Sequence, residues 1–142
     1  MTGEDILELQ IPPEAEYVGT ARLFLAAAGR HFELSEEAVA DLKVAVSEVC
    51  ADAIEDRRTP EPLKIVVRPR LESLQIEVTP TEAGLEADST GARHAATPAT
   101  SFEHSLREPL VRALFPDASY EPQRHSLRLS VPWQVPEDAG TR

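Results

Sequence analysis

The segment over residues 41–56 constrains the fold most, because it predicts a long helix with two distinct faces. At about 100° per residue, small and branched apolar residues gather in one broad stripe, which must be buried against other elements. Acidic residues form a narrow stripe beside it. Carboxylates at the margin of a buried face can hold a cation, activate a hydroxyl, or form a solvated helix edge. The acidic stripe contains Asp41, Glu48, Asp52 and Glu55, and the apolar stripe contains Ala38, Val39, Leu42, Ala45, Val46, Val49 and Ala53.

Patterns on both sides of this segment predict further strands and helices. Apolar and polar residues alternate in four short segments, as in half-buried strands. Helical spacing before the long helix ends at Gly29, a plausible stop, and Ser35 is a plausible N-cap for the long helix itself. A last helical pattern contains Pro109, so we expect its regular part to begin near that proline. The predicted strands cover residues 7–11, 63–67, 74–78 and 127–131, and the flanking helical patterns cover 17–28 and 102–114.

This order of elements predicts an α+β fold. We expect a two-layer sandwich in which a mixed or antiparallel sheet of at least four strands carries three helices on one face. The length of 142 residues suits one domain with its own core. We therefore expect a single domain over residues 1–134, with a long loop over 81–101 and a flexible tail over 135–142.

The composition restricts the classes of partner. A formal net charge of −11 argues against direct binding to nucleic acid, because phosphate neutralisation requires a basic surface. It favours a basic protein partner or a cation. The single cysteine, Cys50, excludes an internal disulfide and lies on the apolar side of its helix, which indicates a small buried residue. Without a signal-like start or a long apolar run, we expect a cytoplasmic protein with no membrane segment.

Few other side chains form a pattern with a chemical meaning. The four histidines lack the spacing of a zinc site. Arg107, Arg112 and Arg124 could contact phosphates, but such arginines are more often surface residues that favour solubility. The hydroxyl residues of the 81–101 loop have no adjacent base, which gives nucleophilic catalysis no support. Trp133 is expected to pack over the end of the sheet.

The long helix resembles the N-box helix of bacterial anti-sigma factor serine kinases, which are small GHKL (histidine-kinase-like) ATPase domains. The order of predicted elements agrees with that fold from about residue 7 to 133. The resemblance implies a Bergerat-type site with ATP and Mg²⁺ as cofactors. Glu48 would be the general base that deprotonates a serine of the antagonist protein. Asp52 stands where the family has a magnesium-binding asparagine, one turn away on the same side. Aspartate is a good magnesium ligand, but it adds a negative charge where the triphosphate must sit.

Two further nucleotide-binding elements of the family are largely missing. The family has an Asp-x-Gly-x-Gly-like motif after the second hairpin strand. Here Pro80 takes the place of the aspartate and Glu82 that of the first glycine, so only Gly84 remains as a candidate cofactor-binding residue. The family also has a glycine motif before its last helix, whose backbone amides cradle phosphate. Residues 92–115 contain no glycine.

These departures favour a binding protein over an enzyme. We expect an anti-sigma-factor-like regulator of transcription in a stress response. It would sequester a sigma factor, be antagonised by an anti-anti-sigma partner of the STAS type, and form a homodimer. The alternative is an active ATP-dependent serine/threonine protein kinase that phosphorylates the anti-anti-sigma factor, with Glu48 as base, Asp52 as metal ligand and the 81–101 loop as ATP lid. A third hypothesis is a domain that serves only as a dimerising partner.

Overall fold

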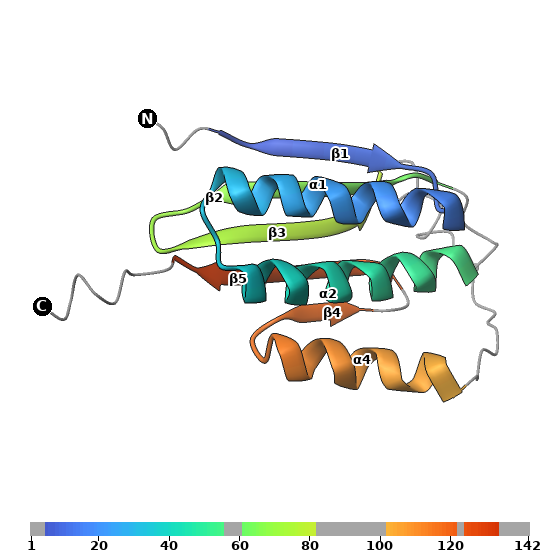
Figure 1. The fold of residues 1–142 in the computed structure, drawn as a ribbon. Coiled ribbons are helices and arrows are strands. Elements are labelled where there is room, and N and C mark those ends of the chain that lie inside the picture. Colours follow the sequence, from blue (N-terminus) through green and yellow to red (C-terminus); the bar gives the residue numbers. More distant parts are fainter. Residues whose placement is uncertain (1–4, 56–60, 82–101, 122–123, 134–142) are drawn as a thin grey trace, which may run out of the picture.

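The computed structural model describes residues 5–55, 61–81, 102–121 and 124–133 (Figure 1). The predicted 81–101 loop, apart from Thr81, lies outside the described residues, as do Glu82, Gly84 and the 135–142 tail. None of the helices in the described ranges is long and apolar enough to cross a membrane. The elements are β1 (Leu7–Ile11), the 3₁₀ helix η1 (Ala15–Tyr17), α1 (Val18–His31), α2 (Glu36–Glu55), β2 (Leu63–Pro69), β3 (Ser73–Pro80), α4 (Phe102–Leu114), β4 (Ser119–Glu121) and β5 (Ser126–Pro132).

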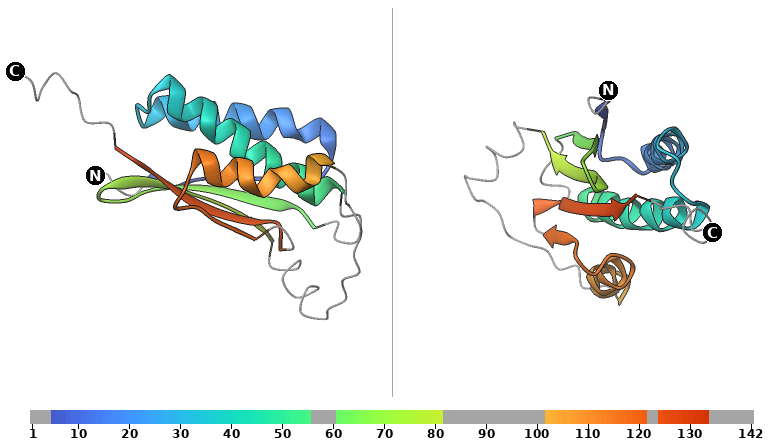
Figure 2. Two further views of the ribbon diagram at one scale, coloured as in Figure 1. Left: turned by 90° about the horizontal axis from the view of Figure 1, so that it is seen from below. Right: turned by 90° about the vertical axis from the view of Figure 1, so that its left-hand side faces the viewer.

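The five strands form one sheet in the order β1-β2-β3-β5-β4. Every neighbouring pair is antiparallel. The helices α1, α2 and α4 lie on the same face of this sheet (Figures 1 and 2). The predicted α+β sandwich is therefore confirmed. The strand that sequence patterns missed is β4, which has three residues and pairs only with β5.

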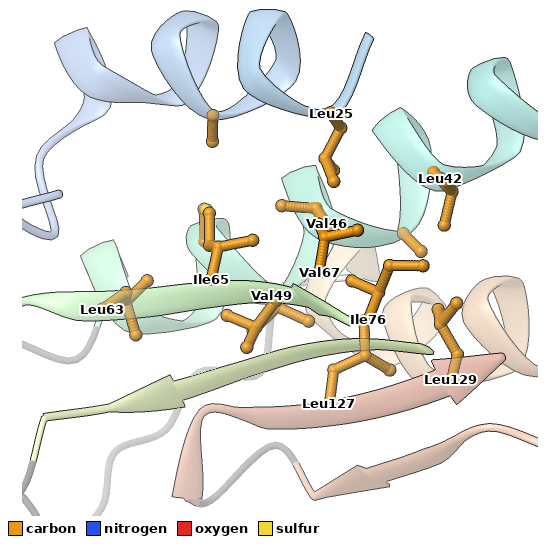
Figure 3. Packing of buried hydrophobic residues seen from close by; sticks show 14 of the residues in the cluster. Leu25, Leu42, Val46, Val49, Leu63, Ile65, Val67, Ile76, Leu127 and Leu129 are labelled. Atoms are coloured by element: carbon orange, nitrogen blue, oxygen red, sulfur yellow. The ribbon is translucent and has the colours of Figure 1, made fainter. Parts of the chain in front are cut away.

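The core lies between the sheet and the paired helices α1 and α2 (Figure 3). Leu25 of α1 and Leu42, Val46 and Val49 of α2 are fully buried above strand residues such as Ile76. Each such side chain contributes roughly 1.5–3 kcal/mol through removal from water. The apolar stripe predicted for α2 is thus its sheet-facing side, and this fixes the rotation of the helix and the direction of its acidic stripe. The Ser35 hydroxyl caps α2 by accepting a hydrogen bond of 3.0 Å from the Ala38 amide.

The expectation that Gly29 ends the first helix is wrong. Helix α1 continues to His31, and the chain then turns through Glu33, whose φ is 59°. Gly29 serves packing instead: a Cβ at this position would lie 2.4 Å from Cγ2 of Val39. The absence of a side chain lets α1 approach α2 closely.

The expectation that the last regular helix begins near Pro109 is also wrong. Helix α4 begins at Phe102 and contains Pro109 in its interior. Proline there removes a helical hydrogen bond and is normally destabilising. Two contacts hold α4 in place on both sides of the proline: Arg107 forms ion pairs with α2, and Val111 is fully buried.

The close approach at Gly29 gives the first prediction. The substitution Gly29→Ala should lower the free energy of unfolding by about 2 kcal/mol, because the new methyl group overpacks the contact with Val39. Gly19→Ala is the matched control, since nothing lies within 4 Å of a Cβ at Gly19 on the same helix. It should change stability by about 0.5 kcal/mol or less, in the stabilising direction. Urea denaturation measures both, and equal effects of the two substitutions would contradict the packing argument.

Candidate functional site: an acidic stripe joined to a buried arginine

The acidic stripe of α2 has a buried residue between two more exposed ones. Glu48, Asp52 and Glu55 follow one another at positions i, i+4 and i+7, which lie on one side of a helix. The exposed fraction of their side chains is 26%, 3% and 48%, respectively. Asp41 belongs to the same predicted stripe but lies two turns nearer the N-terminal end of α2. The structure therefore brings three of the four predicted acids to one site, and Asp52 is its buried member.

Arg107 of α4 lies across this stripe and contacts all three acids. Its Nη1 donates a hydrogen bond of 2.9 Å to Oδ1 of Asp52 and one of 3.0 Å to Oε1 of Glu55. Its Nη2 donates to Oε2 of Glu55 at 2.8 Å, which makes the pair with Glu55 bidentate. Its Nε lies 3.4 Å from Oε1 of Glu48. Every nitrogen of the guanidinium group thus faces a carboxylate of α2.

Tyr120 of β4 completes the site from the side of the sheet. Its hydroxyl group donates a short hydrogen bond to Oδ2 of Asp52. Tyr120 is buried, as is Arg107. Asp52 therefore accepts a hydrogen bond on each carboxylate oxygen, one from α4 and one from β4. We call Glu48, Asp52, Glu55, Arg107 and Tyr120 the α2–α4 cluster.

The environment of the cluster raises the pKa values of its two donors, Arg107 and Tyr120. The hydrogen bond that Arg107 donates to Glu55 is the largest influence on the guanidinium pKa and raises it above its ordinary value, although burial acts in the opposite direction. Burial, followed by the hydrogen bond to Asp52, raises the pKa of Tyr120 above its ordinary value. Both groups remain protonated donors at neutral pH. The three acids and Arg107 carry a combined formal charge of −2, so the site stays negative.

The interpretation of Arg107 as a surface residue is wrong, because its side chain is only 8% exposed. The sequence held a signal for its burial: Arg107 precedes the buried Val111 by four residues and therefore lies on the same side of α4. Tyr120 was not among the predicted site residues. Ala118 and Tyr120 are both buried, with exposed Ser119 between them, which is the alternation of a strand.

The arrangement does not fit a magnesium ion. Carboxylate oxygens are the ligands that Mg²⁺ prefers, and Glu48 and Asp52 do lie on one side of α2. However, Asp52 accepts hydrogen bonds from Arg107 and Tyr120 on its two oxygens. A metal ion bound there would have to displace a buried guanidinium from its ion pairs, which is strongly unfavourable. Across the described parts of the chain, no three His, Cys, Asp or Glu side chains are arranged to hold a metal ion.

Three other residues singled out in the sequence lie within strands or against the core. Pro80 is the last residue of β3 and is paired with Leu63. Cys50 is buried, and burial raises the pKa of its thiol to about 12, so it behaves as the small neutral residue that was predicted. Trp133 is partly buried against the core, and its indole Nε1 donates to the backbone oxygen of Arg70 at 3.0 Å.

Comparison with known proteins agrees with the order of elements. Residues 11–131 match the family model described as "Histidine kinase-like ATPase domain". A segment of 54 residues is 43% identical to the serine-protein kinase RsbW of Oceanobacillus iheyensis and covers 38% of this chain and 34% of that protein. A segment of 77 residues is 32% identical to the anti-sigma-F factor RsbW of Mycobacterium tuberculosis strain H37Rv and covers 54% of this chain and 46% of that protein. The matched segments thus span less than half the length of either relative.

A double-mutant cycle should show that the buried ion pair is strongly coupled. Arg107→Met and Asp52→Asn should each lower the free energy of unfolding by about 3 kcal/mol, because each leaves a buried polar partner behind. Their coupling energy should be about 1–3 kcal/mol. The control is the exposed pair Arg112–Glu108 on the same helix, 2.7 Å apart, whose coupling should be about 0.5 kcal/mol or less. Chemical denaturation of the variants measures both values. Similar coupling in the two pairs would contradict the assignment.

The raised pKa of Tyr120 predicts a specific loss of stability at alkaline pH. In the unfolded chain tyrosine loses its proton near pH 10, whereas folded Tyr120 keeps it, so the folded state binds more protons above that pH. Stability must therefore fall as pH rises. Relative to Tyr120→Phe, the wild-type chain should lose about 1 kcal/mol between pH 10 and 11. Urea denaturation at pH 8, 10 and 11 measures this difference. A constant difference between the two proteins would show that Tyr120 ionises normally in the fold.

Proposed function

The chain belongs to the histidine kinase-like ATPase domain family, and on that basis we propose that it is an anti-sigma-factor-like regulator with a largely degenerate ATP site. In this proposal it binds and sequesters a sigma factor and is antagonised by an anti-anti-sigma protein of the STAS type. The two relatives carry the names of a serine-protein kinase and an anti-sigma factor. Their partners are transferred to this chain only as part of the proposal, because the matches are partial.

The observation that carries the proposal is the pairing of Arg107 with Glu48 and Asp52. A kinase of this family would need Glu48 to take a proton from a substrate hydroxyl and Asp52 to hold Mg²⁺. Here Oε1 of Glu48 lies 3.4 Å from Nε of Arg107, and Oδ1 of Asp52 lies 2.9 Å from Nη1. Phosphoryl transfer depends almost entirely on positioning and on charge neutralisation. Both acids face a cation that belongs to the chain itself, which supports binding without phosphoryl transfer.

Charge also supports a protein partner with a basic surface. The chain carries a formal net charge of −11. Sigma factors bind DNA and therefore present basic surfaces, which an acidic protein can cover with fast, electrostatically steered association. The α2–α4 cluster is negative, so it would repel the negative charge of a triphosphate. We further propose that the protein acts in the cytoplasm, as a homodimer, in the transcriptional response to stress.

The kinase hypothesis keeps one observation in its favour. The side chain of Glu48 is 26% exposed at the edge of the cluster, so solvent reaches one part of the presumed base. A kinase would still need ATP and Mg²⁺ beside Asp52, where Arg107 and Tyr120 are hydrogen-bonded. The two functions therefore differ in one measurable property, which is phosphate transfer that depends on Glu48.

Sigma-factor binding is tested by calorimetric titration of the full chain against each sigma factor of its source organism. We expect one of them to bind with a Kd of about 1 μM or tighter, and an increase in salt from roughly 0.1 to 0.5 M to weaken binding by about tenfold or more. The cognate STAS protein should release the sigma factor. The proposal is wrong if no sigma factor binds.

Kinase activity is tested separately with labelled ATP, Mg²⁺ and the same STAS protein. We expect no transfer of label above that of Glu48→Gln, because the acids of the site are paired with Arg107. Glu48→Gln is the matched control, since it keeps the side-chain size and removes the basic carboxylate. Transfer by the wild-type chain that Glu48→Gln abolishes would establish the kinase alternative.

A further inference from the structure

We propose that the guanidinium group of Arg107 is a built-in cation that takes the place of a divalent metal ion between α2 and α4. Three carboxylates on one side of α2 face its guanidinium nitrogens. Two are held by hydrogen bonds of 2.8–3.0 Å, and Glu48 lies 3.4 Å from Nε. A single positive group of α4 thus contacts three side chains of α2.

The geometry selects an arginine over a metal ion. The planar guanidinium matches the carboxylate of Glu55 with two parallel hydrogen bonds, which no spherical ion reproduces. On the other side of Asp52, Tyr120 presents a proton donor. Both oxygens of Asp52 therefore already accept a hydrogen bond from a side chain of the protein.

A guanidinium group that belongs to α4 differs from a bound ion in that it cannot dissociate from the protein. A metal ion or a nucleotide binds and leaves, and a contact that depends on it changes with its concentration. Arg107 is part of the chain, so the link between α4 and α2 is present whenever the protein is folded. This permanence also suits a helix weakened by an interior proline, since Arg107 precedes Pro109 by two residues.

The inference extends to regulation, and this part rests on the proposed function. If the link needs no metal or nucleotide, the ATP level and the exchange of ATP for ADP leave the arrangement of α2 and α4 unchanged. Binding and release of the sigma factor are then controlled by competition between protein partners alone. The inferred role of Arg107 itself does not depend on which protein the chain binds.

The first test compares the thermal unfolding of the wild-type chain in EDTA, in roughly 10 mM Mg²⁺, and in Mg²⁺ with ATP. A ligand that binds the folded state at 100 times its Kd would raise Tm by several degrees. We expect the three values of Tm to agree within about 1 °C. An increase with Mg²⁺ or with Mg²⁺ and ATP would overturn the proposal, because the site would then exchange its cation.

The second test removes the built-in cation. Arg107→Met should lower Tm in EDTA by about 10 °C, because it removes the positive charge that faces three carboxylates and breaks a buried ion pair. Mg²⁺ at roughly 10 mM should then restore several degrees, since carboxylate oxygens are the ligands that a divalent ion prefers and the guanidinium no longer competes for them. Arg107→Lys keeps a positive charge, so it should lose less and gain nothing from Mg²⁺. Arg112→Met, which changes an exposed arginine on the same helix, should match the wild-type chain in both buffers.

Each result decides for or against the built-in cation. If Arg107→Met does not fold in EDTA, Arg107→Gln, which keeps hydrogen-bond donors, takes its place in the same comparison. A neutral variant that is as stable as wild type, or that does not respond to Mg²⁺, would overturn the proposal. If Mg²⁺ raised the Tm of Arg107→Lys as much as that of Arg107→Met, the proposal would also be overturned. No sigma factor is used, so a failure of sigma-factor binding would leave these results intact.

Discussion

The ion pairs between Arg107 and the carboxylates of α2 link the packing of this domain to its candidate functional site. Burial of the apolar side of α2 against the sheet sets the acidic stripe at the margin of the core. Asp52 is carried inside by this rotation, and a buried carboxylate requires partners. Arg107 and Tyr120 supply them from α4 and β4. One electrostatic requirement therefore places the C-terminal helix and the edge strand relative to the central helix.

Local periodicity predicted most of the fold because the main elements bury a single face. The alternation in β3 and β5 and the apolar stripe of α2 correspond directly to their buried sides. The errors arose where tertiary contacts override local preference. Gly29 has the character of a helix stop, but it lies within α1 and permits close packing against Val39. Pro109 has the character of a helix start, but it lies inside α4, which is held by the contacts of Arg107 and Val111.

The site was predicted in part for a related reason. Glu48 and Asp52 belong to one helix, so their common direction follows from spacing alone. Their partner Arg107 lies 55 residues beyond Asp52 in the sequence, and no periodic pattern connects the two. The burial of Arg107 one turn before Val111 was detectable, but its meaning depends on α4 lying beside α2, which only the tertiary structure provides. The chemical environment of the acids, and hence what they can do, was therefore inaccessible to pattern analysis.

The absence of glycine in residues 92–115 and the presence of Arg107 form one coherent change in the proposed regulator. A glycine motif before this helix would cradle phosphate with backbone amides, but each glycine within a helix costs about 1 kcal/mol. In this chain α4 begins at Phe102 and contains no glycine. Arg107 lies in the second turn of α4, and its Nη1 lies 2.9 Å from Oδ1 of Asp52. In the proposed regulator, a helix with its own positive charge therefore faces the acids beside which a kinase of this family would hold phosphate.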